Sequence, residues 1–106
     1  MPAELIVISW RDIPAQVVAR SGRTRASIEL PGRFQTAIDR AAMNAGLFGS
    51  DEYLEEWRRT SRPCGDDLDA EASAEADRLV ATHPSETINR LVANHGSAIS
   101  PDGETR

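Results

Sequence analysis

The chain has 106 residues and a mass of 11.6 kDa, which is enough for one compact domain. Its longest apolar run, residues 5–8, is far too short for a membrane helix. A net charge of −5 argues against nucleic acid as the main partner, and the absence of lysine excludes lysine-dependent covalent catalysis. Because no basic segment precedes an apolar one at the N-terminus, we expect a cytoplasmic protein.

The first third of the chain has the pattern of a small antiparallel sheet. Residues 4–10 predict a strand that is apolar on both faces, as in the centre of a sheet. Residues 16–20 and 23–30 flank a Ser-Gly turn signal and predict a hairpin whose second arm alternates between apolar and polar residues. The alternative for residues 14–20 is a helical turn with an aspartate cap.

The rest of the chain predicts helices. The first carries an apolar stripe at helical spacing, and Met43 lies off this stripe, which makes it a candidate exposed contact. The third predicted helix, over residues 68–82, has a thinner apolar stripe that is rich in alanine. We expect these helices over residues 32–45, from residue 51 to just before Pro63, over residues 68–82, and from residue 84 to about residue 96, with caps at Ser50 and at Asp66 or Asp67.

These elements together predict an α+β domain, in which an N-terminal antiparallel three-stranded sheet packs against three to four C-terminal helices. The domain covers residues 1–96. Residues 97–106 are polar and contain Pro101 and Gly103, so we expect them to form a disordered tail.

The stretch Arg62-Pro63-Cys64-Gly65 allows two interpretations. Cys64 would lie just ahead of a helix N-terminus and close to Arg62, where a lowered thiol pKa could support nucleophilic or redox chemistry. Alternatively, the stretch connects two helices, and the cysteine fills a small apolar gap. The acidic residues that follow it oppose a thiolate, which favours the connector.

Few other residues form a pattern that is typical of a catalytic, metal-binding or phosphate-binding site. His83 and His95 have no further ligands at helical spacing, and neither a nucleophile elbow nor a glycine-rich phosphate loop occurs. We therefore expect no catalytic residue, no metal site and no cofactor, and we favour a protein that is not an enzyme.

Trp10, Arg11 and Asp12 form the second unusual stretch. Tryptophan and arginine are the residues most enriched at interaction hot spots, so this stretch could be an exposed edge that binds another protein. The alternative is a core tryptophan followed by a local Arg11–Asp12 polar pair.

Four stretches resemble one known family, the small bacterial domain named "virulence factor" in the conserved virulence factor C proteins. The resemblance covers about residues 4–95. In the proteins that give the family its name, the domain is joined to HEAT-like helical repeats and to a domain similar to iron–sulfur scaffolds. The four stretches are WRDIPAQV from Trp10, RFQxAIDRAAM from Arg33, YLExW from Tyr53 and RPCG from Arg62.

The resemblance implies no catalytic residues, and it associates stand-alone members with folate- and corrinoid-dependent one-carbon metabolism. We therefore expect a small accessory subunit that docks on a larger cytosolic protein, such as a methyltransferase or reductase. A homodimer is a further possibility. The alternative function is that of a small thiol, redox or iron–sulfur-related protein using Cys64. The expected partner contacts are Trp10, Arg11, Asp12, Met43, Arg62 and Cys64.

Overall fold

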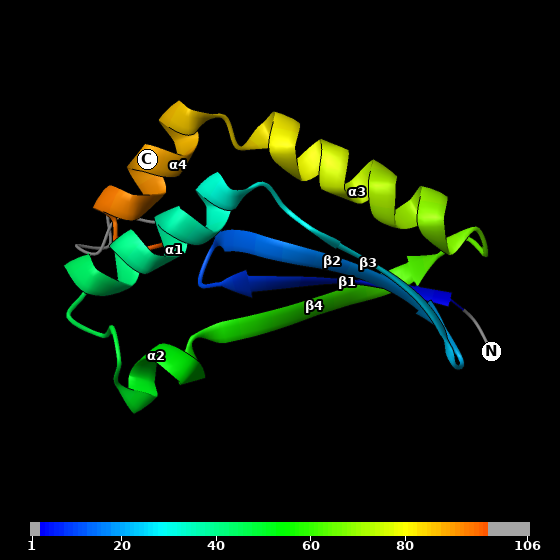
Figure 1. Ribbon diagram of the computed structural model, residues 1–106, viewed down its shortest axis with the longest axis horizontal. Coiled ribbons are helices and arrows are strands. Elements are labelled where there is room, and N and C mark those ends of the chain that lie inside the picture. The colour runs from blue at the N-terminus through cyan, green and yellow to red at the C-terminus, as the bar shows by residue number, and fades with distance from the viewer. Residues whose placement is uncertain (1–2, 98–106) are drawn as a thin grey trace.

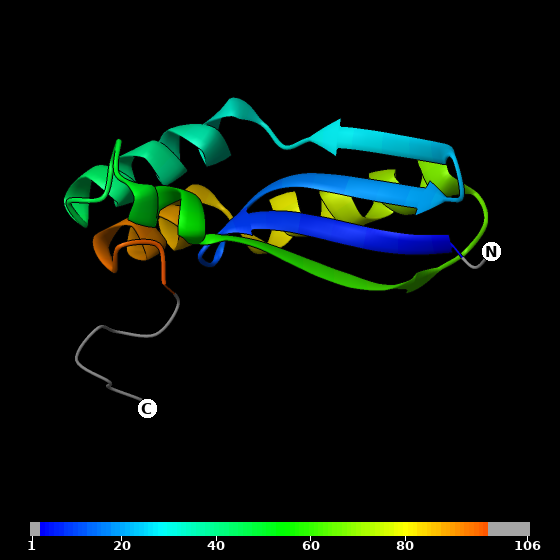
Figure 2. The same ribbon diagram turned by 90° about the horizontal axis from the view of Figure 1, so that it is seen from below.

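The computed structural model describes residues 3–97 and shows one antiparallel sheet packed with helices (Figure 1). Its strands lie in the order β3-β2-β1-β4. Helix α3 lies along one face of the sheet, whereas α1 and α4 pack against each other beyond one end of the strands (Figures 1 and 2). The elements are β1 (Ala3–Trp10), β2 (Ile13–Ser21), β3 (Thr24–Glu29), α1 (Gly32–Asn44), α2 (Asp51–Glu55), β4 (Trp57–Cys64), α3 (Leu68–Thr82) and α4 (Ser85–Ala93).

The predicted α+β class is confirmed, but the sheet has four strands instead of three. The prediction of one helix from residue 51 to Pro63 is wrong, because α2 ends at Glu55 and β4 follows it. Acidic residues three positions before arginines favoured a helix at this place. Pairing of β4 with β1 over eight residues outweighs that weak local preference.

The hairpin predicted from the alternation is confirmed. β2 and β3 pair in register from Gln16 opposite Glu29 to Ser21 opposite Thr24, so the alternative helical turn over residues 14–20 is wrong. β1 lies between β2 and β4, in agreement with its apolar character on both faces.

The local signals for helix ends are confirmed at three places. The Ser50 side chain accepts a hydrogen bond from the Tyr53 N–H and caps α2. Asp67 caps α3 by accepting from the Ala70 N–H. Gly46 follows α1 with a φ of +74°, in the left-handed region that glycine enters without steric cost. The predicted disordered tail lies outside the described residues, apart from Ser97.

One charged side chain of α3 is buried against the sheet. Glu75 accepts hydrogen bonds from Arg78 on the same helix and from Arg62 on β4. The hydrogen bonds from Arg78 hold the pKa of Glu75 below its ordinary value, against the opposing effect of desolvation. Because the folded pKa is the lower one, this cluster stabilises the fold at neutral pH, and its contribution is lost as the solution becomes acidic.

Trp10 joins the sheet to three other segments. Its side chain is fully buried, and its ring stacks on Tyr53 of α2 with 5.7 Å between ring centroids. The indole N–H donates to the Tyr53 carbonyl over 2.8 Å. The guanidinium of Arg11 lies 5.0 Å from the ring centroid, and Gly96, after α4, packs directly on the ring.

Replacing Gly96 by alanine tests this contact. A Cβ at this position would lie 2.8 Å from the Trp10 ring, and the φ of +93° adds backbone strain. Gly22→Ala is the matched control, because its φ is also positive but its Cβ would have open space. We expect Gly96→Ala to lower the free energy of unfolding by about 3 kcal/mol and Gly22→Ala by about 1 kcal/mol, measured by urea denaturation. Equal losses would contradict the packing of Gly96 on Trp10.

Candidate functional site

The structure separates the residues that the sequence suggested as partner contacts. Trp10 is buried in the core, so it is not an exposed anchor. Arg11 and Asp12 form the tight connection between β1 and β2, next to α2. Arg62 and Cys64 lie toward the opposite end of the sheet, where β4 ends.

The expected local pair between Arg11 and Asp12 is replaced by contacts with distant residues. Arg11 donates to the Glu56 carboxylate over 3.2 Å and to the His95 carbonyl over 2.8 Å. Asp12 lies 3.6 Å from the guanidinium of Arg58. Arg11 has a φ of +52°, a strained value for a residue with a side chain, and its several contacts offset that strain. This turn therefore holds the fold together.

The surroundings of Cys64 disfavour a reactive thiolate. The residue ends β4 and is half-buried, and it lies three residues before Asp67, the N-cap of α3. Desolvation raises the pKa of its thiol above the ordinary value, and the negative charge of Glu71 raises it further, whereas Arg62 lowers it. Within residues 3–97, no group of three or more His, Cys, Asp or Glu side chains could hold a metal ion.

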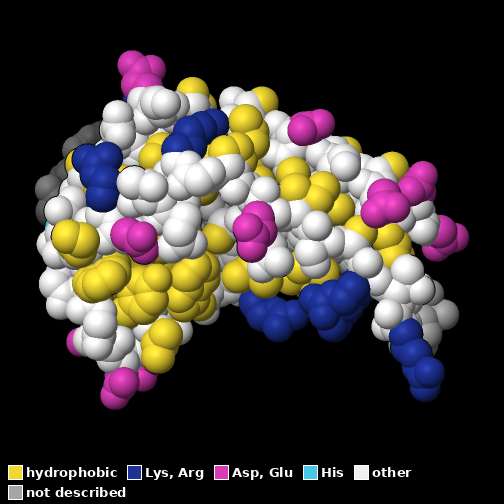
Figure 3. Space-filling view, viewed as in Figure 1, with side chains coloured by type: hydrophobic (Ala, Val, Ile, Leu, Met, Phe, Trp, Pro, Cys, Tyr) yellow, Lys and Arg dark blue, Asp and Glu magenta, His cyan; other side chains and the backbone are white. Residues whose placement is uncertain are grey.

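Three large apolar side chains are exposed at one end of the molecule. Met43 of α1, Phe48 of the following loop and Leu54 of α2 are 61%, 60% and 64% exposed. We call these three residues the apolar end. Figure 3 shows a continuous area of apolar side chains between α1 and α2. Met43 is the one predicted contact residue among these three exposed side chains.

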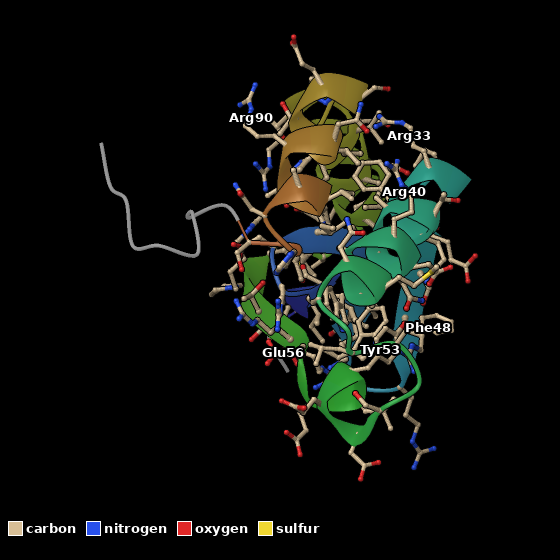
Figure 4. The ribbon with its side chains drawn as sticks, turned by 90° about the vertical axis from the view of Figure 1, so that its left-hand side faces the viewer. Arg33, Arg40, Phe48, Tyr53, Glu56 and Arg90 are labelled. Atoms are coloured by element: carbon tan, nitrogen blue, oxygen red, sulfur yellow. The ribbon has the colours of Figure 1, made fainter. Side chains whose placement is uncertain are left out.

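Aromatic rings connect the apolar end to the core. Phe48 contacts Tyr53 edge to face, with 6.1 Å between ring centroids, and the two lie side by side in Figure 4. Tyr53 in turn contacts Trp57 edge to face and stacks on Trp10. Partial burial and the charge of Asp39 raise the pKa of Tyr53, so its phenol stays neutral at physiological pH. The exposed Phe48 side chain therefore packs on a series of aromatic rings that continues into the core.

The second notable surface is the face of the sheet opposite α3, which we call the open face. Alternation along the strands places Glu4, Ile6 and Ile8 of β1 on it, together with their register partners on the other strands. The surface is hollowed beneath the strands, and arginine side chains line the hollow (Figure 3). α2 projects from the same side of the sheet at one end (Figure 1).

A groove lies where the open face meets the first turn of α1. Its volume is about 640 Å³, within the range of about 300–1,000 Å³ that is usual for binding pockets. Its lining combines an indole ring and aliphatic side chains with two amides and one carboxylate. The lining residues are Ile8, Ala15, Gln16, Glu29, Leu30, Gly32, Gln35 and Trp57. Such a groove can accept an apolar side chain and hydrogen-bond the backbone beside it.

A comparison with protein families matches residues 8–92 to the model described as "Virulence factor". The chain belongs to this family. Neither the curated proteins nor the solved structures contain a match to the chain. The resemblance seen in the sequence is thus confirmed, and the matched residues include the apolar end, the groove and most of the sheet.

Sequence reasoning missed Phe48, Leu54 and the open face. The prediction of one helix from residue 51 to just before Pro63 hid the exposure of Leu54. The open face depends on β4, whose existence was not predicted. Only the alternation of β3, with Arg25, Ser27 and Glu29 on one side, pointed to a solvent-facing side of the sheet.

Alkylation of the single cysteine tests the assignment of Cys64 as a structural residue. Because burial and acidic neighbours raise its pKa, we expect the folded protein to react with iodoacetamide more slowly at pH 8 than the same chain in urea. A folded protein that reacts faster than the unfolded chain would show an activated thiol and would contradict this assignment.

Proposed function

We propose that this protein is a non-catalytic interaction module, an accessory subunit that docks on a larger protein through its apolar end. The observation that carries the proposal is the exposure of three large apolar side chains, Met43, Phe48 and Leu54, on α1, the following loop and α2, at the end of the molecule where Figure 3 shows a continuous apolar area. Large apolar side chains gathered in this way are typical of protein-binding surfaces.

The contacts that hold α2 and Tyr53 in place support this role. Tyr53 is fixed by its stack on Trp10 and by the hydrogen bond between its carbonyl and the indole N–H. α2 itself is capped by Ser50 at its start. A surface that is already ordered loses less conformational entropy when a partner binds, so more of the burial energy contributes to affinity.

The family resemblance suggests the kind of partner. We propose a cytoplasmic protein, such as a methyltransferase or reductase, that acts in folate- or corrinoid-dependent one-carbon metabolism. This part of the proposal rests on the resemblance alone. The alternative thiol or redox role of Cys64 has less support, since the raised pKa of the thiol opposes it.

A matched pair of charge insertions tests the docking surface. Leu54→Glu places a charge in the apolar end, whereas Ala81→Glu places the same charge on the exposed side of α3. Tagged wild-type protein and both variants are used to capture proteins from an extract of the native host, and bound proteins are identified by mass spectrometry. We expect wild type and Ala81→Glu to retain one stoichiometric partner and Leu54→Glu to lose it.

Thermal melting of each variant serves as the control for folding. Leu54 and Ala81 are both exposed, so neither substitution should move the melting temperature by more than a few degrees. An unchanged partner on Leu54→Glu, or an empty eluate from wild type, would refute docking through the apolar end.

A further inference from the structure

Within residues 3–97, strand β3 forms one edge of the sheet and has β2 as its one neighbouring strand (Figure 2). The two strands pair in continuous register from Ser21 opposite Thr24 to Gln16 opposite Glu29. α3 packs on one face of β2 and β3, and α1 starts beyond the end of β3, so neither helix covers the outer edge (Figure 2). A regular edge of this kind is a template for pairing with a further strand.

The hairpin determines which backbone groups of β3 point outward. The Leu30 N–H, just after β3, donates to the Ala15 carbonyl of β2 over 3.0 Å. In an antiparallel pair the N–H and C=O groups of successive residues point to opposite sides, so every second residue before Leu30 also bonds to β2. The residues between them point these groups away from the sheet. They are Arg25, Ser27 and Glu29.

Two of these outward residues carry charges that have no ion pair. Arg25 and Glu29 are both exposed, and neither forms a salt bridge within residues 3–97. Arg25 lies opposite Arg20 on β2, which is already paired with Glu4, so an acidic group on its outer side would offset the repulsion between the two arginines. Arg25 and Glu29 themselves are about 13 Å apart along the strand, too far to pair with each other.

We propose that β3 pairs antiparallel with β3 of a second copy of this chain, which joins the two sheets edge to edge. A two-fold axis perpendicular to the sheet passes between the Ser27 residues of the two copies. Arg25 of each copy then lies opposite Glu29 of the other. All three outward residues form hydrogen-bonded pairs, with about six backbone hydrogen bonds in total. The edge is thus complementary to itself in both its backbone groups and its charges, as a symmetric dimer requires.

The charges select this register over the neighbouring ones. An axis at Arg25 or at Glu29 places like charges opposite each other, which is unfavourable. An axis at Ala26 or at Ile28 sets Ser27 opposite one of the charges and carries the other beyond the end of the partner strand. Only the register centred on Ser27 pairs both charges within the two strands.

The other edge of the sheet is less suited to pairing with itself. β4 carries Arg58, Arg59 and Arg62 and no acidic residue, so two β4 strands would bring like charges together. Pro63, near the end of β4, has no N–H to donate. Of the two edges, β3 is therefore the one that fits a second copy.

The position of α2 is compatible with edge-to-edge pairing. α2 lies at the end of the sheet where α1 and α4 also lie (Figures 1 and 2). An axis perpendicular to the sheet turns the second copy end over end, so its α2 lies at the opposite end of the joined sheet and does not meet the first. The apolar end of each copy stays exposed. The proposal therefore goes beyond the docking function and does not depend on it.

Charge exchange at Arg25 and Glu29 tests the proposal by sedimentation velocity of the purified chain, from low micromolar to several hundred micromolar protein. Because a single pair of edge strands forms a small interface, we expect wild type to dimerise in the micromolar range. Arg25→Glu or Glu29→Arg alone places like charges opposite each other at both ends of the seam and should weaken the dimer about tenfold. The double variant exchanges both charges and should recover nearly the wild-type affinity.

Arg59→Glu is the matched control, because it makes the same change of charge at an exposed position on the far edge of the sheet. It should dimerise like wild type. Melting curves at low concentration check that all variants fold. Since Arg25 and Glu29 do not reach each other within one chain, rescue by the double variant reports a contact between chains. A monomeric wild type, or a double variant as weak as the single ones, would overturn the proposal.

Amide hydrogen exchange read by NMR identifies the strand that pairs. We expect the amides of Arg25, Ser27 and Glu29 to exchange more slowly at high than at low protein concentration, because they gain hydrogen-bond partners only in the dimer. The amides of Ala26 and Ile28, which already bond to β2, should change less. A dimer that leaves exchange at the three outward amides unchanged would use another surface and would overturn the proposal.

Discussion

The arrangement of this fold depends on the burial of Trp10 at the end of the central strand. Its ring contacts Tyr53 of α2, its N–H bonds the Tyr53 carbonyl, and Gly96 lies against its other side. Strand β4 begins opposite it, with Trp57 as its register partner. One side chain thereby fixes where α2 projects and where the chain after α4 ends. Phe48 of the apolar end contacts Tyr53, which stacks on Trp10. The buried core therefore holds this part of the exposed surface in place.

Strong local signals allowed much of the fold to be predicted. The apolar stripe from Phe34 to Ala42 and the caps at Ser50 and Asp67 depend on neighbours within one or two helical turns, so the sequence displays them directly. β4 could not be predicted in this way. Its arginines follow glutamates at helical spacing, and its extended conformation results from pairing with β1, whose residues lie 47 to 61 positions earlier in the chain.

The candidate site was predictable only where it coincides with a local signal. Met43 is exposed because it lies off the stripe of α1, and this was visible in the sequence. Trp10 was ambiguous, since a tryptophan followed by arginine and aspartate suits both an interface and a buried corner. Leu54 and the open face depend on where α2 ends and β4 begins, so their exposure follows from tertiary structure. The described residues point most clearly to one binding surface, the apolar end beside the aromatic contacts of Tyr53.

The most direct measurement is solvent accessibility at individual methyl groups by NMR with a soluble paramagnetic agent, for the protein alone and with its captured partner. If a partner docks on the apolar end, relaxation enhancement at the Met43 and Leu54 methyls should fall when the partner is added. The Ala81 methyl, on the exposed side of α3, should keep its enhancement. Enhancements at Met43 and Leu54 that do not change when the partner binds would contradict the account.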